Sequence, residues 1–447
     1  MTALRIRLVI MGVAVMALIA PFGFGDSQVR IVRLSDVQGV VEVDRNLHGF
    51  EKAFLNLPIT QNNAVRTETD GRAQIEFEDG SVLRMTPATT IEFTKLSLGD
   101  SGTRMSTVAL KSGVTYVDFK DKKDAQLSLI FGREKVVLTR PAHLRIEVSD
   151  KSAAVADFGG DVAVESPSGA VQLSKNRTAI FNLDDKDGGK VAKYVDPGPY
   201  DAWDKKDEQY QQRYNSSVLS TTSSYTYGLA DLNYYGSFFN APGYGLMWQP
   251  YFAGANWDPF MDGAWAFYPG TGYGWVSGYP WGWTPYHSGA WTFISGTGWA
   301  WQPGGTWMGV NTRPRVLNSP ANFVAPSAPA TTGRNLIAVN RGPSTTFVGH
   351  STTRVVLRNN SAGLGVPRGE VNNLAQISQR VNVQGAAVAR IHSAAVEMDL
   401  GSESRISRTG FDSQASSSSG LPAGRSSVQT SPSSAIHSAP AAGHVGK

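Results

Sequence analysis

Apolar and polar residues alternate along much of the first part of the chain. In segment 73–78, Ala, Ile and Phe occupy every second position while Gln and Glu occupy the others, which is typical of a β-strand with one buried face. An Asp-Gly pair at 70–71 and another at 79–80 bracket this strand, and Asp-Gly is a strong hairpin signal. Further strand patterns recur about every 8–12 residues, with no long helical segment between them. The pattern predicts an all-β domain over residues 29–195, either a sandwich or a short solenoid.

A second pattern, built on aromatic residues, covers residues 217–310. The motif Trp257-x-Pro259-Phe260 recurs as Trp283-x-Pro285-Tyr286, and a partial copy stands at Trp248-x-Pro250-Tyr251. The offset between the two full copies also relates Trp265 to Trp291. Gly and Pro stand between the Trp residues, which favours short strands joined by tight turns and disfavours helix. The repeat predicts stacked units that form a compact antiparallel β meander.

Residues 196–216 join these two regions and carry a helical pattern. Tyr200, Trp203, Tyr210 and Tyr214 lie at spacings that place them on one face of a helix over 201–214, with charged residues on the other face. We expect an amphipathic linker helix that packs its aromatic face on a neighbouring domain. A partner-binding helix is the alternative interpretation.

After residue 310 the composition shifts to Ser, Ala, Pro, Thr and Arg. Such a composition buries too little apolar surface to offset the entropy of ordering. Residues 311–447 are therefore predicted to be a low-complexity, largely disordered tail. The β-like runs between Leu336 and Val383 are either weak strands or no structure.

The N-terminus has the features of an export signal. Arg5 and Arg7 precede an apolar run from Leu8 to Ala20, and small residues follow before Asp26. The pattern predicts a signal peptide over residues 1–25, cleavage near Gly25/Asp26, and a periplasmic or secreted protein. The apolar run is too short to span a bilayer, so no transmembrane span is expected in the mature chain. The chain has no Cys, which excludes disulfides, Cys-ligated metals and a lipoprotein anchor.

The motifs of the first region resemble the FecR domain, a periplasmic module named for the iron-dicitrate regulator. The matching segments are Gly39-Val-Val-Glu-Val43, Asn63-x-Val65-x-Thr67, Asp70-Gly-Arg-Ala73, Phe77-x-Asp79-Gly-Ser-x-Leu-Arg84, Thr89-Thr90 and, in the second half, Gly160-x-Val162-x-Val164. The aromatic region resembles the C-terminal half of exported FecR-domain proteins of unassigned function. In the regulator this domain follows a cytoplasmic anti-sigma segment and a membrane helix. Because export is expected from residue 1 here, signal relay across a membrane is not implied by the resemblance.

The aromatic region has an unusual charge pattern. Ten of the eleven Trp lie between Tyr244 and Trp307, where there is no Lys, Arg or Glu. Nucleic-acid binding is excluded there, because stacking surfaces for nucleic acid need cationic neighbours. Either the Trp residues form the core, or exposed rings bind a cell-wall carbohydrate or a quaternary ammonium ligand. The candidate ligand-binding residues are Trp248, Tyr251, Trp257, Trp265, Trp283, Tyr286 and Trp291.

Catalytic and metal-binding motifs are absent from the sequence. There is no Gly-x-Ser-x-Gly nucleophile elbow, no His-Glu-x-x-His and no Walker loop, and no His has a partner at ligand spacing. Strand alternation and a turn explain the carboxylates Glu76, Glu78 and Asp79 without general acid chemistry. We therefore expect a non-enzymatic envelope protein without metal or cofactor, whose partner is cell-wall polysaccharide or another envelope protein. An aromatic binding protein and a FecR-like sensing component are the alternatives.

Overall fold

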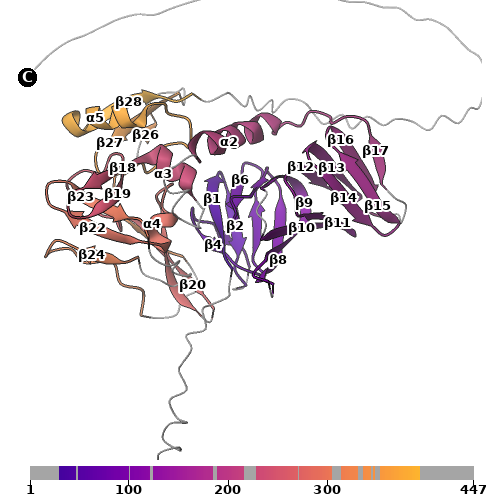
Figure 1. Ribbon diagram of the computed structural model, residues 1–447, viewed down its shortest axis with the longest axis horizontal. Coiled ribbons are helices and arrows are strands. Elements are labelled where there is room, and N and C mark those ends of the chain that lie inside the picture. The colour runs from indigo at the N-terminus through magenta and orange to yellow at the C-terminus, as the bar shows by residue number, and fades with distance from the viewer. Residues whose placement is uncertain are drawn as a thin grey trace, which may run out of the picture. The chain divides into compact units, whose positions relative to one another are not determined.

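The computed structural model describes most of the chain between residues 30 and 392 (Figure 1). The described segments are 30–46, 49–99, 101–120, 124–184, 189–215, 228–269, 271–304, 314–330, 336–343, 346–347 and 353–392. The expected signal peptide over residues 1–25, Trp307 and the tail beyond residue 392 lie outside the described residues.

Residues 32–192 form two β-sheets that share one strand. Across the first sheet the strands run in the order β4 (Pro58–Ile59), β1 (Val32–Gln38), β6 (Arg72–Glu76), β7 (Val82–Met85), β9 (Arg104–Phe119), β12 (Ala142–Val148), β13 (Ser152–Gly159), β16 (Arg177–Asn182) and β17 (Lys190–Ala192). Across the second sheet they run in the order β3 (Glu51–Lys52), β2 (Val41–Asp44), β5 (Ala64–Thr67), β8 (Thr90–Leu98), β9, β10 (Ala125–Phe131), β11 (Glu134–Leu138), β14 (Asp161–Ser166) and β15 (Gly169–Ser174). The prediction of an all-β fold is confirmed.

The long strand β9 crosses from one sheet to the other at Gly113. Its residues up to 112 pair with β8 and β10, and those from 113 onward pair with β7 and β12. Gly113 has φ +93°, and a Cβ at this position would lie 2.6 Å from the Cα atom of Thr89. Only glycine fits such a close backbone approach in the left-handed region.

The core of this domain lies between the two sheets. Val32, Leu34 and Ile75 come from the first sheet, and Val65 and Ile91 from the second, and all five side chains are fully buried. The alternation of the sequence therefore places the apolar face of each sheet against the other, as in a sandwich.

The aromatic region is built from three β-hairpins. They are formed by β18 (Gly236–Ala241) and β19 (Gly245–Pro250), by β20 (Asp262–Tyr268) and β21 (Gly272–Ser277), and by β22 (Ala290–Ile294) and β23 (Gly298–Gln302). The first and third hairpins share a sheet, in which β19 pairs with β23 through Trp248 and Trp301. The second hairpin belongs to a separate sheet. The repeat units are thus hairpins, but they do not form the continuous meander that the sequence suggested.

A glycine lies beneath a Trp ring in each hairpin. A Cβ on a glycine within one residue of the start of the first strand would lie 2.4–2.7 Å from an indole atom of the Trp on the second strand. The three pairs are Gly236 with Trp248, Gly263 with Trp275, and Gly289 with Trp301. The Gly and Trp positions of the repeat therefore have one structural cause, which is the packing of an indole ring on bare backbone.

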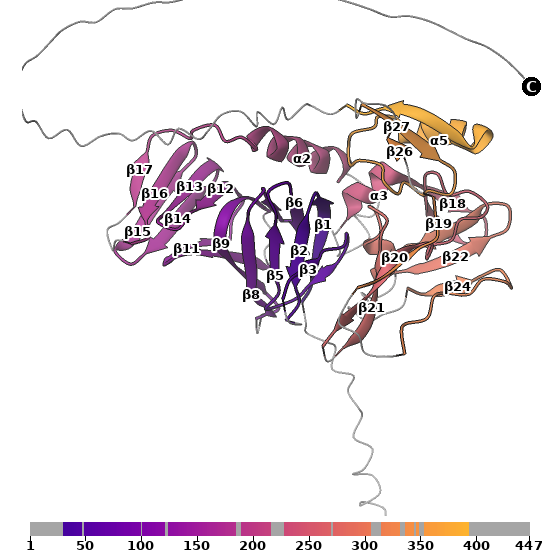
Figure 2. The same cartoon turned by 180° about the vertical axis from the view of Figure 1, so that it is seen from behind.

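The prediction of a largely disordered tail over residues 311–447 is wrong for much of residues 314–392. This part contains β24 (Val316–Asn318), β25 (Ile337–Asn340), β26 (Thr346–Phe347), β27 (Arg354–Arg358), α5 (Leu374–Gln384) and β28 (Ala386–Arg390). β25 pairs with β20, and β24 pairs with β22. Buried residues of β27 and α5 belong to the same apolar cluster as the Trp residues, and both views place these elements beside β18 (Figures 1 and 2). The aromatic region has too few strands to cover its own Trp rings, and these later elements complete its core.

Three further helices are described: α2 (Asp201–Tyr214), α3 (Leu229–Tyr235) and the short α4 (Thr284–His287). The helix expected over 201–214 is present as α2, and its Trp203 and Tyr210 are buried. Asp204 is buried too, so the charged residues of α2 do not all face solvent as the sequence suggested. No helix in the described segments is both long enough and apolar enough to cross a membrane.

Candidate functional site

Helix α2 lies on the first sheet of the sandwich and is held there by its carboxylates. Asp204 accepts hydrogen bonds from Arg84 Nη1 at 2.8 Å and pairs with His143 Nε2 at 2.7 Å. Asp201 accepts from Arg145 Nη1 at 2.7 Å and from the Tyr116 hydroxyl at 2.6 Å. Burial alone would lower the pKa of His143, but the contact with Asp204 outweighs it and the pKa is raised.

Asp231, in the first turn of α3, is the centre of a buried charge network. Its carboxylate accepts hydrogen bonds from Arg368 Nε at 2.9 Å and Nη2 at 3.0 Å and from the Tyr210 hydroxyl at 2.9 Å. It also forms an ion pair with Arg33 Nη2 at 2.7 Å. Burial would raise the pKa of Asp231, but the charges of Arg368 and Arg33 outweigh it and the pKa lies below its ordinary value. Four segments distant in sequence therefore meet at one carboxylate.

Arg33 joins the sandwich to the aromatic region. This fully buried side chain on β1 pairs with Glu76 Oε2 at 3.0 Å and also donates to the carbonyl oxygen of Pro280 at 2.7 Å. Asn56, which accepts from Arg33 Nε, donates to the carbonyl oxygens of Ser277 and Tyr279. Such a network fixes the two regions relative to each other, because separating them would leave buried charges unpaired.

A cleft of about 350 Å³ opens beside this network. It is lined by residues 35–38 of β1, by Asp231 and Tyr235 of α3, and by residues 365–368 and Glu370. The cleft contains the carboxylates of Asp36 and Glu370 together with the ion pair of Asp231 and Arg368. Its volume is at the low end of the range of about 300–1,000 Å³ for ligand pockets, which often lie between domains. This cleft and its charge network are the candidate functional site.

Six of the seven sequence-predicted ligand-binding residues are core residues instead. Trp248, Trp257, Trp265, Trp283, Tyr286 and Trp291 are all buried, and Tyr251 is partly buried. Trp283 packs into the core of the sandwich, while the other five buried residues belong to the cluster that β27 and α5 complete. Buried rings offer no face to a sugar or a quaternary ammonium group, so the aromatic-surface hypothesis is not supported.

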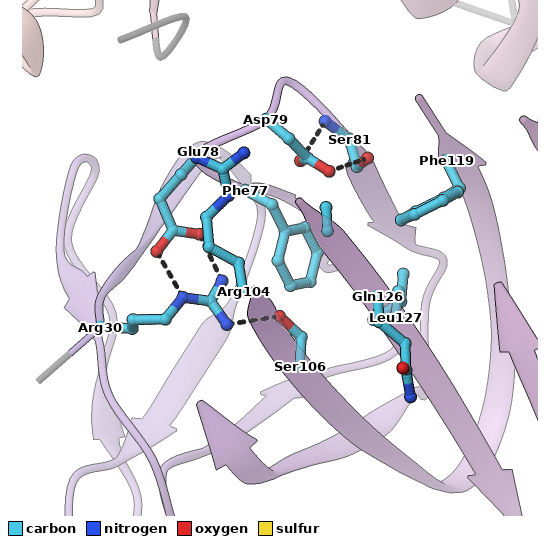
Figure 3. Close-up of a pocket in the computed structure, with 11 residues that line it drawn as sticks. Arg30, Phe77, Glu78, Asp79, Ser81, Arg104, Ser106, Phe119, Gln126 and Leu127 are labelled. Carbon is cyan, nitrogen blue, oxygen red and sulfur yellow. Dashed lines mark hydrogen bonds and ion pairs between the residues drawn. The ribbon is translucent and has the colours of Figure 1, made fainter. Parts of the chain in front are cut away.

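The carboxylates of the Asp79-Gly80 hairpin have structural partners (Figure 3). Glu78 pairs with Arg30, and Asp79 accepts from the backbone N–H and the hydroxyl of Ser81. The adjacent cavity of about 10 Å³ has room for about one water molecule. Asp79 thus stabilises the turn as alternation and a turn predicted, whereas Glu78 is held by Arg30 and Glu76 belongs to the Arg33 network.

Because His287 is buried, we predict that the free energy of unfolding depends on pH. Its ring is buried against Trp283, at 4.2 Å between ring centroids, and its Nδ1 lies 2.9 Å from the Trp283 carbonyl oxygen. Burial lowers the pKa of His287 to about 4, with a smaller effect of the Arg33 charge in the same direction. The unfolded chain, with a pKa near 6.5, therefore binds the proton first. Stability is full above about pH 6.5 and falls by about 2–3 kcal/mol as the pH drops toward 4.

The measurement compares urea unfolding of the wild type and of His287→Gln at pH 7.5 and pH 4.5. The difference between the two proteins isolates the histidine, because burial raises the pKa of Asp207 and of Asp262 to about 6 and these groups act in the opposite direction. We expect the wild type to lose stability relative to the variant at pH 4.5. Equal losses in both proteins would contradict a buried neutral His287.

Comparisons with known proteins agree with this two-part organisation. Residues 63–176 match the model of the FecR protein family, and residues 229–321 match that of a family of unknown function, DUF6600. A search of curated proteins finds no match.

Two crystal structures of a candidate anti-sigma factor from Parabacteroides distasonis ATCC 8503 are similar in part. One, at 1.65 Å resolution, has 19% identity and a TM-score of 0.26, and the match covers 31% of this chain and 63% of that one. The other, at 2.50 Å, has 16% identity and a TM-score of 0.26 over 36% and 70% of the chains.

Proposed function

We propose that this chain, in which a FecR domain precedes a region of the DUF6600 family, is a non-enzymatic exported protein of the cell envelope that acts as an interaction module. The FecR match supports an envelope or signalling module. The charged N-terminus, the apolar run and the small residues before Asp26 support export.

The observation that carries the interaction role is the Arg33–Asp231–Arg368 network. It holds the FecR domain and the aromatic region together, and it forms part of the cleft wall through Asp231 and Arg368. A cleft whose walls are fixed before binding loses little conformational entropy when a partner enters. The buried Trp residues then have a structural role, which is to make the aromatic region rigid.

Export is tested by cell fractionation and N-terminal sequencing of the full chain expressed in its native host. We expect a mature protein that begins near Asp26 in the envelope or the medium, and a cytoplasmic protein when residues 2–25 are deleted. A full-length chain that keeps Met1 and stays in the cytoplasm would overturn the proposal.

A further inference from the structure

The cleft lies along an open edge of β1. Within the described residues, residues 33–38 of β1 pair with β6 on one side. On the other side, the pairing with β4 at residues 32 and 33 and the backbone hydrogen bonds of Leu34 with residues 56 and 57 end before Ser35. Ser35, Asp36, Val37 and Gln38 all line the cleft. A β-bulge interrupts the alternation of side chains at Ser35, but Asp36, Val37 and Gln38 beyond it alternate between the two faces. A cavity that all three of these residues border therefore runs along the strand edge.

The charges in the cleft select for a cation. Within the described residues, the only hydrogen bond to the Asp36 carboxylate comes from Gln38 Nε2, at 2.8 Å. Glu370, which also lines the cleft, uses Oε1 to pair with Lys206, while its Oε2 is buried and has no hydrogen-bond partner among the described residues. The guanidinium group of Arg368 already makes a bidentate pair with Asp231. Among the residues that line the cleft, the carboxylates of Asp36 and Glu370 therefore keep acceptor capacity, and the guanidinium group of Arg368 is paired with Asp231.

An extended peptide fits these two features together. An unpaired strand edge offers backbone N–H and C=O groups to a further strand, and this is a common mode of peptide recognition. Four residues of strand extend roughly 13 Å, which matches the four β1 residues that border the cleft. Val37, Leu55 and Val366 add apolar contacts on the walls.

We propose that this cleft binds an extended peptide segment that adds as a strand to the edge of β1 and places a lysine or arginine side chain against Asp36 and Glu370. The inference names the partner of the interaction module and so rests on the proposed function. A basic segment of an envelope protein meets these requirements.

The test begins with a random dodecapeptide phage library selected on the immobilised full chain, with Asp36→Asn as the matched protein for counter-selection. We expect enriched peptides in which a basic residue is flanked by β-branched or aromatic residues. Absence of enrichment, or enrichment of acidic peptides, would overturn the proposal.

The best peptide is then synthesised and titrated by fluorescence anisotropy. We expect Asp36→Asn to weaken binding at least about tenfold, as for loss of a charge-assisted hydrogen bond. The exposed carboxylate Asp161 is the control, and Asp161→Asn should leave affinity within about twofold. N-methylation of alternate peptide amides should also weaken binding at least about tenfold, because it removes the donors to the strand edge.

Unchanged binding by Asp36→Asn would overturn the cation site, and unchanged binding of the N-methylated peptide would overturn strand addition. A free lysine or amine that competes as well as the peptide would likewise contradict an extended ligand. These results are independent of cellular location. An exported chain that binds no such peptide overturns this inference alone, and a cytoplasmic chain that binds one overturns only the proposed export.

Discussion

Replacement of Asp231 by asparagine is expected to lower the free energy of unfolding by about 3–5 kcal/mol. The asparagine keeps the shape of the side chain but removes the charge that Arg33 and Arg368 share. Both guanidinium groups are almost completely buried, with side-chain exposures of 0% and 9%, so water cannot take the place of the lost carboxylate. A buried charge without a partner costs far more than the net contribution of the intact pair.

The loss should also separate the unfolding of the two regions. Arg33 belongs to the sandwich and Asp231 to the aromatic region, so the network is a main link between them. Trp fluorescence reports mainly on the aromatic region, since all Trp except Trp203 lie there, and far-UV circular dichroism reports on both regions. In urea we expect coincident transitions in the wild type and an earlier fluorescence transition in Asp231→Asn.

Asp258→Asn is the control for this experiment. Asp258 pairs with the half-exposed Arg341 at 3.5 Å, a geometry that contributes at most about 1 kcal/mol. An Asp231 variant that loses no more stability than the Asp258 variant would show that the network does not hold the regions together.

Strand alternation predicted the all-β class of the first domain correctly and left a sandwich and a short solenoid open, but it placed the polar residues wrongly. In β6 the alternation puts Glu76 on the face opposite Ile75. Alternation alone predicts that this polar face of the sheet is exposed to water. The structure covers this face with α2, α3 and residues 277–280, so Glu76, Arg33 and Arg84 are buried. Period-two patterning shows which face is apolar, but it cannot show that a polar face is also an interface.

The elements after residue 310 were predicted only in part. The weak strands considered between Leu336 and Val383 are present as β25, β26 and β27, whereas the pairing of β25 could not be foreseen because its partner lies far away in sequence. β25 is four residues long and pairs with a strand about 75 residues earlier. The local composition of such a segment is that of a loop. The sequence does indicate the helix α5. Leu374, Ile377 and Val381 follow helical spacing, and all three side chains are buried.

The charge network also left a trace in the sequence. Asp231 is one of three acidic residues in a long stretch without any Lys or Arg. An isolated carboxylate in an apolar context is costly unless a distant cation pairs with it. Its partners Arg33 and Arg368 could not be identified from spacing, because nearly 200 residues separate Arg33 from Asp231 and over 130 separate Asp231 from Arg368.

Truncation of Trp265 and of Trp291 to alanine should cost similar amounts, about 3–5 kcal/mol each. The two residues are related by the repeat and occupy matching places in their hairpins. Trp265 faces Trp275 across β20 and β21, and Trp291 faces Trp301 across β22 and β23. Each ring is buried, so each truncation leaves a cavity that neighbouring rings cannot fill without losing their edge-on contacts.

Urea melts of the two variants, run beside retention assays on cell-wall fragments, distinguish a core role from a binding role. Tyr244→Ala is the matched aromatic control, because Tyr244 is 37% exposed in the turn of the first hairpin and should cost less than about 1 kcal/mol. If the rings form the core, both Trp variants should lose similar, large amounts of unfolding free energy. Their retention on cell-wall fragments should then be no lower than that of Tyr244→Ala. Unchanged unfolding midpoints together with lost retention would mean that these rings reach a ligand, and the aromatic region would then be a binding surface rather than the rigid wall of the cleft.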